Sequence, residues 1–395
     1  MKIHKIIWLA AACLLALPAV AKDKDEHKSP SSEAVDVFAP NIKGSPYKSV
    51  RIPCIVNAGG TLIAAAEGRY AASGDQAEND IIVSVSTNGG KTWSKPTIAA
   101  KSDNGSTFNN PCLIYDAVKK QTLCFYQRYP KGQKERDIST LDLKDPKALR
   151  NFVVFSKNGK SWSKPVEVTS TTRHEDCATS CSGPNPGVQL TRGEHKGRLV
   201  VVFNEAVRFG KWHITAAYSD DHGETWKMAS GRTRDCGINE VSSVETEDGG
   251  VFVVSRDQNC GGSKFISTST DGGDTWSEAT THSELPCPQC QNGLTRYSFA
   301  DDEKLGSKGR ILFSGPKGPG RQRIDGIIKM SYDDGKTWPV EKLVAPNAFG
   351  YSAMCPVKPG YVGLLYEGNG AIKFLKFSLK WLTDGEDSGL ASKKQ

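Results

Sequence analysis

The chain has 395 residues, of which 37% are hydrophobic and 24% are charged. This composition is typical of a folded protein with a full-sized core, and it excludes a chain that is disordered throughout. The formal net charge is +7 and is spread along the sequence, which excludes the basic blocks of a nucleic-acid-binding protein but suits an anionic ligand.

The first residues have the pattern of a secretory signal peptide. Lys2 and Lys5 flank the start of an apolar stretch over residues 6–20, which ends in the small-x-small cleavage site Ala19-Val20-Ala21. This stretch is shorter than the roughly 20 apolar residues of a membrane span, and no later segment comes closer. We therefore expect cleavage after Ala21 and a secreted or periplasmic protein. A lipid anchor on Cys13 is the weaker alternative, because the apolar stretch continues beyond it.

The cysteines favour disulfides or buried thiols over a metal site. Ten of the 11 cysteines follow the signal peptide, and an even number in an exported protein permits disulfides. Cys177 with Cys181, and Cys287 with Cys290, are the closest pairs in the sequence. No histidine or further cysteine pair flanks them at zinc-finger spacing, so we expect no metal.

A short turn sequence recurs along the chain. Residues 219–226, 269–276 and 331–338 share the pattern S-x-D-x-G-x-T-W, residues 86–93 have asparagine for the aspartate, and residues 156–162 are one residue shorter. The aspartate suits bonds to nearby amides, glycine permits positive φ, and tryptophan packs beneath the turn. We expect a structural role, because one aspartate per loop is far from a complete calcium shell.

Six apolar runs alternate with these turns, and each begins with glycine or a polar residue and ends in abrupt polarity. Continuous runs rich in Val, Ile and Leu predict strands that are buried on both faces. Repeated small sheets arranged radially account for both periods, so the predicted fold is all-β, a six-bladed β-propeller. The runs cover residues 61–67, 121–127, 197–204, 250–256, 309–314 and 360–367, and residues 371–382 form a final strand pattern.

This fold predicts one domain over residues 46–382, after a polar leader over residues 22–45 and before a frayed tail over residues 383–395. If the apolar runs are the innermost strands, their polar ends gather at one mouth of the central channel. These ends are Glu67, Arg69, Gln127, Arg128, Asn204, Glu205, Arg256, Asp257 and Glu367.

The sequence Val50-Arg51-Ile52-Pro53 completes a pattern that, with the turn boxes, resembles the exo-α-sialidase (neuraminidase) family with Asp-box, or BNR, repeats. The resemblance extends from about Ser49 to Leu382. The family often has phenylalanine where Val50 stands, a difference that concerns packing beside the arginine. The resemblance implies hydrolysis of terminal sialic acids from glycoproteins, glycolipids or oligosaccharides, without metal or organic cofactor.

By resemblance, Arg51, Arg256 and Arg323 form a triad that binds the sialic acid carboxylate. Three planar, permanently charged guanidiniums hold one carboxylate with better geometry than lysines would. Arg321 lies two residues before Arg323, and the following Ile-Asp-Gly sequence favours Arg323 as the third member.

The resemblance also assigns the catalytic groups. Asp75, in a Gly- and Ser-rich loop, matches the family's acid/base catalyst. Tyr351 matches the nucleophile and Glu240 the base that takes its proton. An anionic nucleophile would be repelled by the substrate carboxylate, whereas a neutral tyrosine avoids that cost.

Four further residues complete the predicted site. Glu367 matches a family glutamate that positions Arg51, and Glu67 is suited to the same task for Arg69. Arg69 and Asn110 are expected to contact substrate, although relatives place aspartate near Asn110, beside the N-acetyl or 4-hydroxyl group.

Two alternatives use the same fold. A catalytically silent propeller that binds glycans would be free to lose Tyr351, Glu240 or Asp75, yet all three are present. A trans-sialidase or an intramolecular trans-sialidase would share every residue named. Linkage preference, the sialic acid variant and the oligomeric state are not determined by these motifs.

Overall fold

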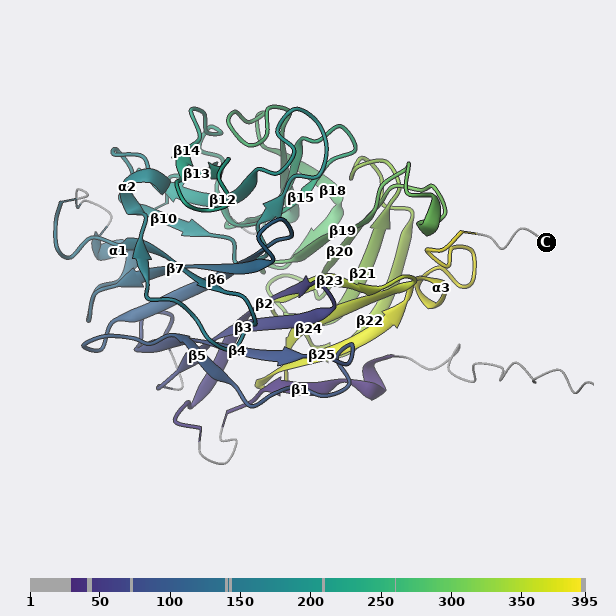
Figure 1. The fold of residues 1–395 in the computed structure, drawn as a ribbon, viewed down its shortest axis with the longest axis horizontal. Coiled ribbons are helices and arrows are strands. Elements are labelled where there is room, and N and C mark those ends of the chain that lie inside the picture. Colours follow the sequence, from purple (N-terminus) through teal and green to yellow (C-terminus); the bar gives the residue numbers. More distant parts are fainter. Residues whose placement is uncertain are drawn as a thin grey trace, which may run out of the picture.

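The computed structural model of the chain describes residues 30–40, 45–71, 74–138, 141, 144–207, 210–259 and 261–391. Figure 1 shows these residues as small sheets arranged side by side around the molecule. The colours pass from purple through teal and green to yellow, and the purple strand β1 (Val35–Phe38) lies beside the yellow strand β25 (Ala371–Ser378). The expected signal peptide, including Cys13, lies outside the described residues.

The described strands form six blades, which confirms the predicted propeller. Three sheets have four strands and one has five, and an eight-stranded sheet divides into two blades at a single parallel contact between Asn79 and Thr107. The first blade contains β2 (Ser49–Ala58), β3 (Thr61–Arg69), β4 (Asn79–Ser86) and β5 (Thr97–Ala100). The second contains β6 (Thr107–Asp116), β7 (Gln121–Tyr129), β8 (Arg150–Ser156) and β9 (Val166–Glu167). The third contains β10 (Thr179–Ser182), β11 (Val188–Gln189), β12 (Leu199–Ala206), β13 (Trp212–Ser219) and β14 (Lys227–Met228). The fourth blade contains β15 (Ile238–Glu245), β16 (Val251–Asp257), β17 (Gly262–Ser269) and β18 (Thr280–Cys287). The fifth contains β19 (Gly293–Ser298), β20 (Arg310–Pro316), β21 (Ile324–Ser331) and β22 (Val340–Ala348). The sixth contains β23 (Ser352–Lys358), β24 (Tyr361–Gly368), β25 and β1.

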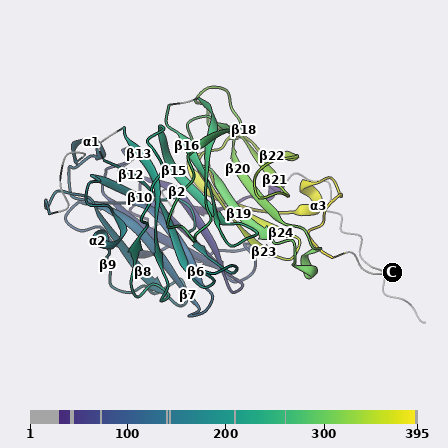
Figure 2. The same ribbon diagram turned by 90° about the horizontal axis from the view of Figure 1, so that it is seen from above.

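The helices are short, and Figure 2, the view from above, shows α1, α2 and α3 at the periphery. Of these, α2 connects the second blade to the third, and α1 lies within the second blade. No helix in the described part of the chain has the length and apolar character to cross a membrane. The helices are η1 (Pro30–Glu33), α1 (Glu135–Ile138), α2 (Thr169–Thr172), η2 (Glu303–Leu305) and α3 (Leu379–Leu382).

The six apolar runs are the second strands of the blades, so the assumption that they are the innermost strands is wrong. The first strands contact one another around the centre, for example β2 with β6 and β23. By contrast, β3 is paired along both edges, with β2 and β4. A second strand is therefore enclosed on every side and is apolar throughout, whereas an innermost strand carries polar side chains into the central space. The final strand also ends earlier than predicted, because the Ser378 hydroxyl accepts the Trp381 amide and starts α3.

The turn boxes connect the third and fourth strands of the first five blades. In the third blade, Ser219 Oγ donates to Asp221 Oδ1 at 2.7 Å, and the same oxygen accepts the Thr225 amide at 2.8 Å. Trp226 packs edge-on against Phe125 of the second blade, with 4.6 Å between ring centres. These contacts support the structural interpretation: the aspartate is used within its own loop, and the tryptophan joins neighbouring blades.

Two segments that were expected outside the propeller belong to it. β1 lies within the predicted leader and forms the outer strand of the last blade. The described part of the predicted tail is also packed, because the buried carboxylate of Asp387 binds the buried guanidinium of Arg310 at 2.7 and 2.8 Å. A guanidinium without solvent needs such a partner, and this requirement fixes the tail against the fifth blade.

The nine cysteines in the described part of the chain are free thiols, and eight of them are buried. Cys177 and Cys181 are not bonded to each other, nor are Cys287 and Cys290. The expected disulfides therefore find no support among these residues, and the buried-thiol interpretation applies to both pairs.

Candidate active site

A cleft of about 250 Å³ lies at the end of the propeller opposite the turn boxes, and residues from all six blades line it. Nine predicted site residues are among them, and the tenth, Glu367, lies directly behind Arg51. Arg321, the alternative to Arg323, is exposed and does not line the cleft. The lining consists of the predicted residues Arg51, Glu67, Arg69, Asp75, Asn110, Glu240, Arg256, Arg323 and Tyr351, with Ile52, Gln76, Asn109, Tyr129, Glu135, Cys181, Asn204, Trp212, Asn239 and Gln258 in addition.

The predicted ring of polar strand ends reaches the cleft only in part. Side chains alternate between the two faces of a strand, so neighbours at a strand end point in different directions. Arg128, for example, turns outward and binds Asp103 through two hydrogen bonds of 2.9 Å. The members that do not line the cleft are Gln127, Arg128, Glu205, Asp257 and Glu367.

The three arginines of the predicted triad surround the ring of Tyr351. Arg256 Nη1 donates to the Tyr351 hydroxyl oxygen at 2.9 Å. The guanidinium carbons of Arg51 and Arg323 lie 5.0 and 5.1 Å from the ring centre. Three positive groups therefore converge on a buried tyrosine, and they give this part of the cleft a positive charge that suits an anion.

Each guanidinium is held by a different partner. Arg51 Nε donates to Glu367 Oε1 at 2.7 Å, and Arg256 Nη1 donates to Glu240 Oε2 at 2.8 Å. Burial alone would lower the pKa of each of these arginines, but the adjacent carboxylate raises it above its usual value. Arg323 instead donates to the backbone carbonyl of Gln289 at 2.9 Å. The third guanidinium therefore has no carboxylate of its own among the described residues and remains the most available to a ligand anion.

Tyr351 and Glu240 form a hydrogen-bonded pair in the centre of the cleft. The Tyr351 hydroxyl donates to Glu240 Oε1. Burial raises the pKa of this hydroxyl well above its usual value, and the Glu240 carboxylate raises it further, although Arg256 lowers it in part. The tyrosine is therefore protonated at neutral pH. Among the described residues, Glu240 is the acceptor of the hydrogen bond that its hydroxyl donates.

Glu367 fixes the bend that presents Arg51. Its Oε1 accepts both the Arg51 side chain and the Ile52 amide, the latter at 2.9 Å, and its Oε2 accepts the Tyr351 amide at 3.2 Å. Ile52 has a φ of 62° in a bulge of β2, which is a strained conformation for a β-branched residue. One carboxylate thus holds the arginine, the strained bend and the backbone of the tyrosine in register.

The neighbouring blade repeats this bend with different side chains. Asn109-Asn110-Pro111 stands where the first blade has Arg51-Ile52-Pro53, and Asn110 has a φ of 53°. Glu67 Oε1 accepts the Asn110 amide and the Asn109 side chain, both at 2.9 Å. Glu67 Oε2 accepts Arg69 Nη2 at 2.6 Å. Asn109 was not predicted, and its match to Arg51 ahead of an X-Pro pair is the signal that would have found it.

Asp75 lies at the rim of the cleft, in the loop between β3 and β4. Its side chain is 70% exposed, and its Oδ1 lies 3.1 Å from Arg69 Nη1. Its carbonyl oxygen accepts Asn109 Nδ2 at 3.0 Å. A carboxylate in this position borders both the cleft and solvent.

A second wall, formed by blades two and three, was not predicted. Glu135 of α1 accepts a hydrogen bond from Trp212 Nε1 at 3.3 Å, and Tyr129 and Cys181 lie in the same wall. Burial raises the pKa of the Glu135 carboxyl, and the nearby Glu240 carboxylate raises it further. This wall is free of guanidiniums among the lining residues, so the cleft has one cationic side and one side with a carboxyl and aromatic rings.

The fold and the site define a class of protein: an Asp-box propeller whose cleft places three arginines around a tyrosine–carboxylate pair. A family profile described as BNR repeat-like domain matches residues 60–364. The chain therefore belongs to the sialidase family of BNR repeat-like domains.

The similar proteins agree with this assignment. A sialidase of Micromonospora viridifaciens is 29% identical over 344 residues, which cover 85% of this chain and 52% of the relative. A sialidase of Bacteroides fragilis strain YCH46 is 29% identical over 340 residues, which cover 81% and 60%. Among solved structures, the Hadza microbial sialidase Hz136 has a TM-score of 0.79 and 26% identity, with coverage of 88% of this chain and 69% of that chain. The chain thus spans only about half to three fifths of the length of these two curated relatives.

Proposed function

We propose that the chain is a retaining exo-α-sialidase that removes terminal sialic acids from glycoproteins, glycolipids or oligosaccharides. The observation that carries this proposal is the convergence of Arg51, Arg256 and Arg323 on Tyr351, whose hydroxyl donates to Glu240. Sialic acid bears a carboxylate on its anomeric carbon, so guanidiniums that bind the carboxylate also bring that carbon next to the tyrosine. The similarity to bacterial sialidases supports the same reaction.

Substrate binding in this proposal begins with the carboxylate. Arg323 donates to a backbone carbonyl and contacts no carboxylate directly among the described residues, so its charge is the most available, and Arg51 and Arg256 add oriented N–H donors. Arg69 and Asn110, on the adjacent blades, face the ring substituents. The carboxylate therefore fixes the sugar, and the remaining groups set its orientation.

Tyr351 attacks the anomeric carbon, and its proton passes to Glu240 as the new C–O bond forms. A carboxylate nucleophile would be repelled by the substrate carboxylate, whereas a protonated tyrosine is neutral until the attack begins. Arg256 Nη1, 2.9 Å from the hydroxyl oxygen, stabilises negative charge that develops on it. The product of this step is a sialyl-tyrosine.

Asp75 donates a proton to the leaving glycosidic oxygen and then takes one from the water that hydrolyses the intermediate. Its exposed position at the rim suits both steps, because the leaving group and the water share the solvent side of the cleft. Two displacements at the same carbon retain its configuration, so the first product is α-sialic acid.

Proton NMR of the purified protein with 2,3- and 2,6-linked sialyl-lactose tests this proposal. We expect α-sialic acid to appear first from the wild type and from Tyr332→Phe, a variant of an exposed tyrosine outside the cleft. Tyr351→Phe, with an unchanged circular dichroism spectrum, should lose nearly all turnover. A 2,7-anhydro sugar as the first product would indicate intramolecular transfer, transfer to lactose would indicate a trans-sialidase, and no release from folded wild type would indicate a silent propeller.

We also propose that the protein is exported, with cleavage after Ala21, on the basis of the N-terminal sequence. N-terminal sequencing of protein from the culture medium or the periplasm should begin at Lys22. Retention of residues 1–21, or recovery of a protein lipidated at Cys13 from the membrane fraction, would contradict this proposal.

A further inference from the structure

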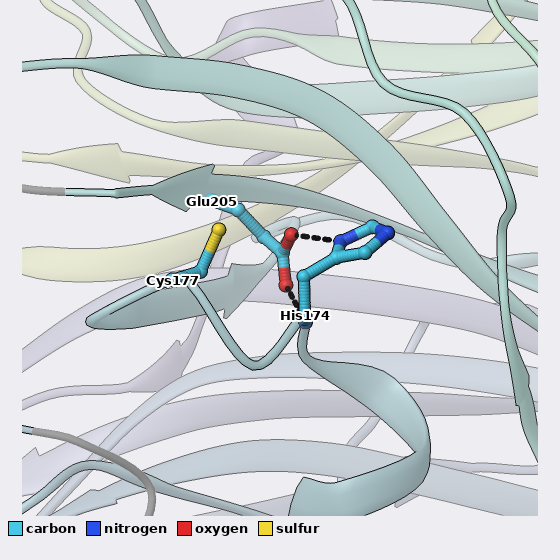
Figure 3. A group of neighbouring side chains, drawn as sticks. All are labelled: His174, Cys177 and Glu205. Carbon is cyan, nitrogen blue, oxygen red and sulfur yellow. Dashed lines mark hydrogen bonds and ion pairs between the residues drawn. The ribbon is translucent and has the colours of Figure 1, made fainter.

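A second cluster of reactive side chains lies behind the third-blade wall of the cleft. Figure 3 shows the Glu205 carboxylate between the Cys177 thiol and the His174 ring. Their donor atoms all lie within 4.8 Å of one another. Glu205 comes from β12, whereas His174 and Cys177 come from the loop between α2 and β10. The cluster takes no part in the proposed sialidase chemistry.

We propose that His174, Cys177 and Glu205 bind a zinc ion. Imidazole nitrogen, thiolate sulfur and carboxylate oxygen are the three donor types that zinc takes in proteins, and three protein ligands leave a fourth position for water. Donor atoms around tetrahedral zinc lie roughly 3.3–3.7 Å apart. The present separations, all within 4.8 Å, bracket that spacing, and His174 Nδ1 lies 2.6 Å from Glu205 Oε2.

The supporting contacts orient each donor toward the others. His174 Nε2 lies 3.1 Å from the Ala229 carbonyl oxygen, which accepts only, so Nε2 carries a proton and Nδ1 is the nitrogen that faces Glu205. A hydrogen bond of this kind from the other ring nitrogen is the usual support of a metal-binding histidine. Glu205 Oε1 accepts the His174 amide at 3.1 Å, which leaves Oε2 directed at the ring.

One cation lies beside the Cys177 thiol and would help to stabilise a thiolate on a bound metal. Arg232 Nη1 lies 3.3 Å from Cys177 Sγ, and the same guanidinium is anchored by Asp176 at 2.6 and 2.9 Å. Zinc binding would release two protons, the second ring proton of His174 and the thiol proton of Cys177. The neutral histidine, thiolate and carboxylate would then balance the charge of the ion.

Zinc at this position would tie the loop before β10 to the wall of the cleft. Cys181 on β10 pairs with Asn204 on β12, and both line the cleft, while Glu205 is the next residue. Glu205 and Cys177 are buried, and the His174 side chain, at 23% exposure, provides the route to solvent. We therefore expect zinc to raise stability and to act on the fold of this wall rather than on the reacting atoms.

Cobalt(II) absorption and zinc titration of the intact protein test the proposal. The wild type, stripped with a chelator, should bind one ion per chain, with a thiolate-to-cobalt charge-transfer band, and zinc should raise its thermal unfolding midpoint. Cys236→Ser, which changes a half-buried thiol outside the cluster, should behave like the wild type. Cys177→Ser should lose the band.

His174→Gln provides a second readout if Cys177→Ser fails to fold. It should lower zinc affinity by more than about 100-fold, because a lost supporting hydrogen bond alone costs about 10- to 100-fold. The proposal is overturned if the wild type binds no stoichiometric ion, or if the charge-transfer band is equally strong in wild type and in folded Cys177→Ser. None of these measurements depends on sialidase activity.

Discussion

The first and second blades carry the same bend at the cleft but present different chemistry from it. In both, a glutamate at the end of a second strand accepts the amide of a residue with positive φ on the next blade: Glu367 with Ile52, and Glu67 with Asn110. The residue before the bend is Arg51 in one blade and Asn109 in the other. The hydrogen bond from the bend to the glutamate is thus common to both blades and belongs to the propeller scaffold. The residue before the bend differs, and it determines which chemistry each blade presents to the cleft.

The largest expected effect comes from making the first bend resemble the second. Arg51→Asn should lower kcat/KM on sialyl-lactose by about 100- to 1,000-fold, because one oriented charge in the carboxylate site is lost. Steady-state kinetics checks this, with Arg128→Asn as the matched control, since Arg128 pairs with Asp103 outside the cleft. Equal losses in both variants would show that general positive charge, not the bend, is responsible.

Glu67 and Glu367, which accept the amides of the two bends, should differ in what they stabilise. Glu67→Gln removes the buried ion partner of Arg69 and leaves only the exposed Asp75, so it should lower the free energy of unfolding by about 3 kcal/mol. Glu367→Gln removes the ion partner of the more exposed Arg51, so it should lower the free energy of unfolding by only about 1 kcal/mol. It should raise KM about tenfold, because Arg51 would no longer be held in one orientation. Denaturant titration and kinetics of both variants measure the contrast, and the reverse pattern would contradict it.

The second wall should respond to pH in a way that the arginine wall does not. Burial raises the pKa of Glu135 in the folded state above its unfolded value, so the folded protein binds more protons between the two values. The contribution of Glu135 to the free energy of unfolding is therefore fully present at low pH, and it is lost as pH rises through the folded-state pKa. Thermal unfolding from pH 4 to 8 should show wild type losing stability relative to Glu135→Gln as pH rises. Parallel curves for the two proteins would contradict the expectation.

The smallest effect concerns the bends themselves. Asn tolerates positive φ whereas isoleucine does not, but Ile52 also packs with Cys290 and Tyr351. Asn110→Gly should therefore change the free energy of unfolding by less than about 0.5 kcal/mol. Ile52→Gly should destabilise by about 1–3 kcal/mol, because the loss of buried contacts exceeds the strain that is relieved. Equal values from denaturant titration would mean that Ile52 contributes no packing to the nucleophile.

The sequence predicted the parts of the site that belong to motifs. Arg51, Tyr351 and Asp75 stand in recognisable segments, and the cleft includes them. The wall with Glu135 and Trp212 carries no motif, since its residues meet only because blades two and three are adjacent. The innermost strands were misassigned because hydrophobicity reports enclosure on both faces, not distance from the axis.

Long-range pairing accounts for the remaining omissions. The ion pair between Arg310 and Asp387 joins residues 77 positions apart. The polar sequence of the tail therefore predicted a frayed segment and gave no sign of this contact. The zinc site proposed here departs from the expectation of no metal: His174 and Cys177 are three residues apart, but the third donor, Glu205, lies on another strand. Such contacts follow from the topology of the blades and not from local patterns.

The central claim is that Tyr351 forms a covalent bond to the sugar. Incubation with a 2,3-difluorinated sialyl donor, which slows hydrolysis of the intermediate, followed by intact-mass and peptide mass spectrometry, tests it most directly. We predict one sialyl adduct per chain on the peptide that contains Tyr351, absent in Tyr351→Phe. An adduct on Glu240, or turnover of sialyl-lactose by the same preparation without any adduct, would contradict the account.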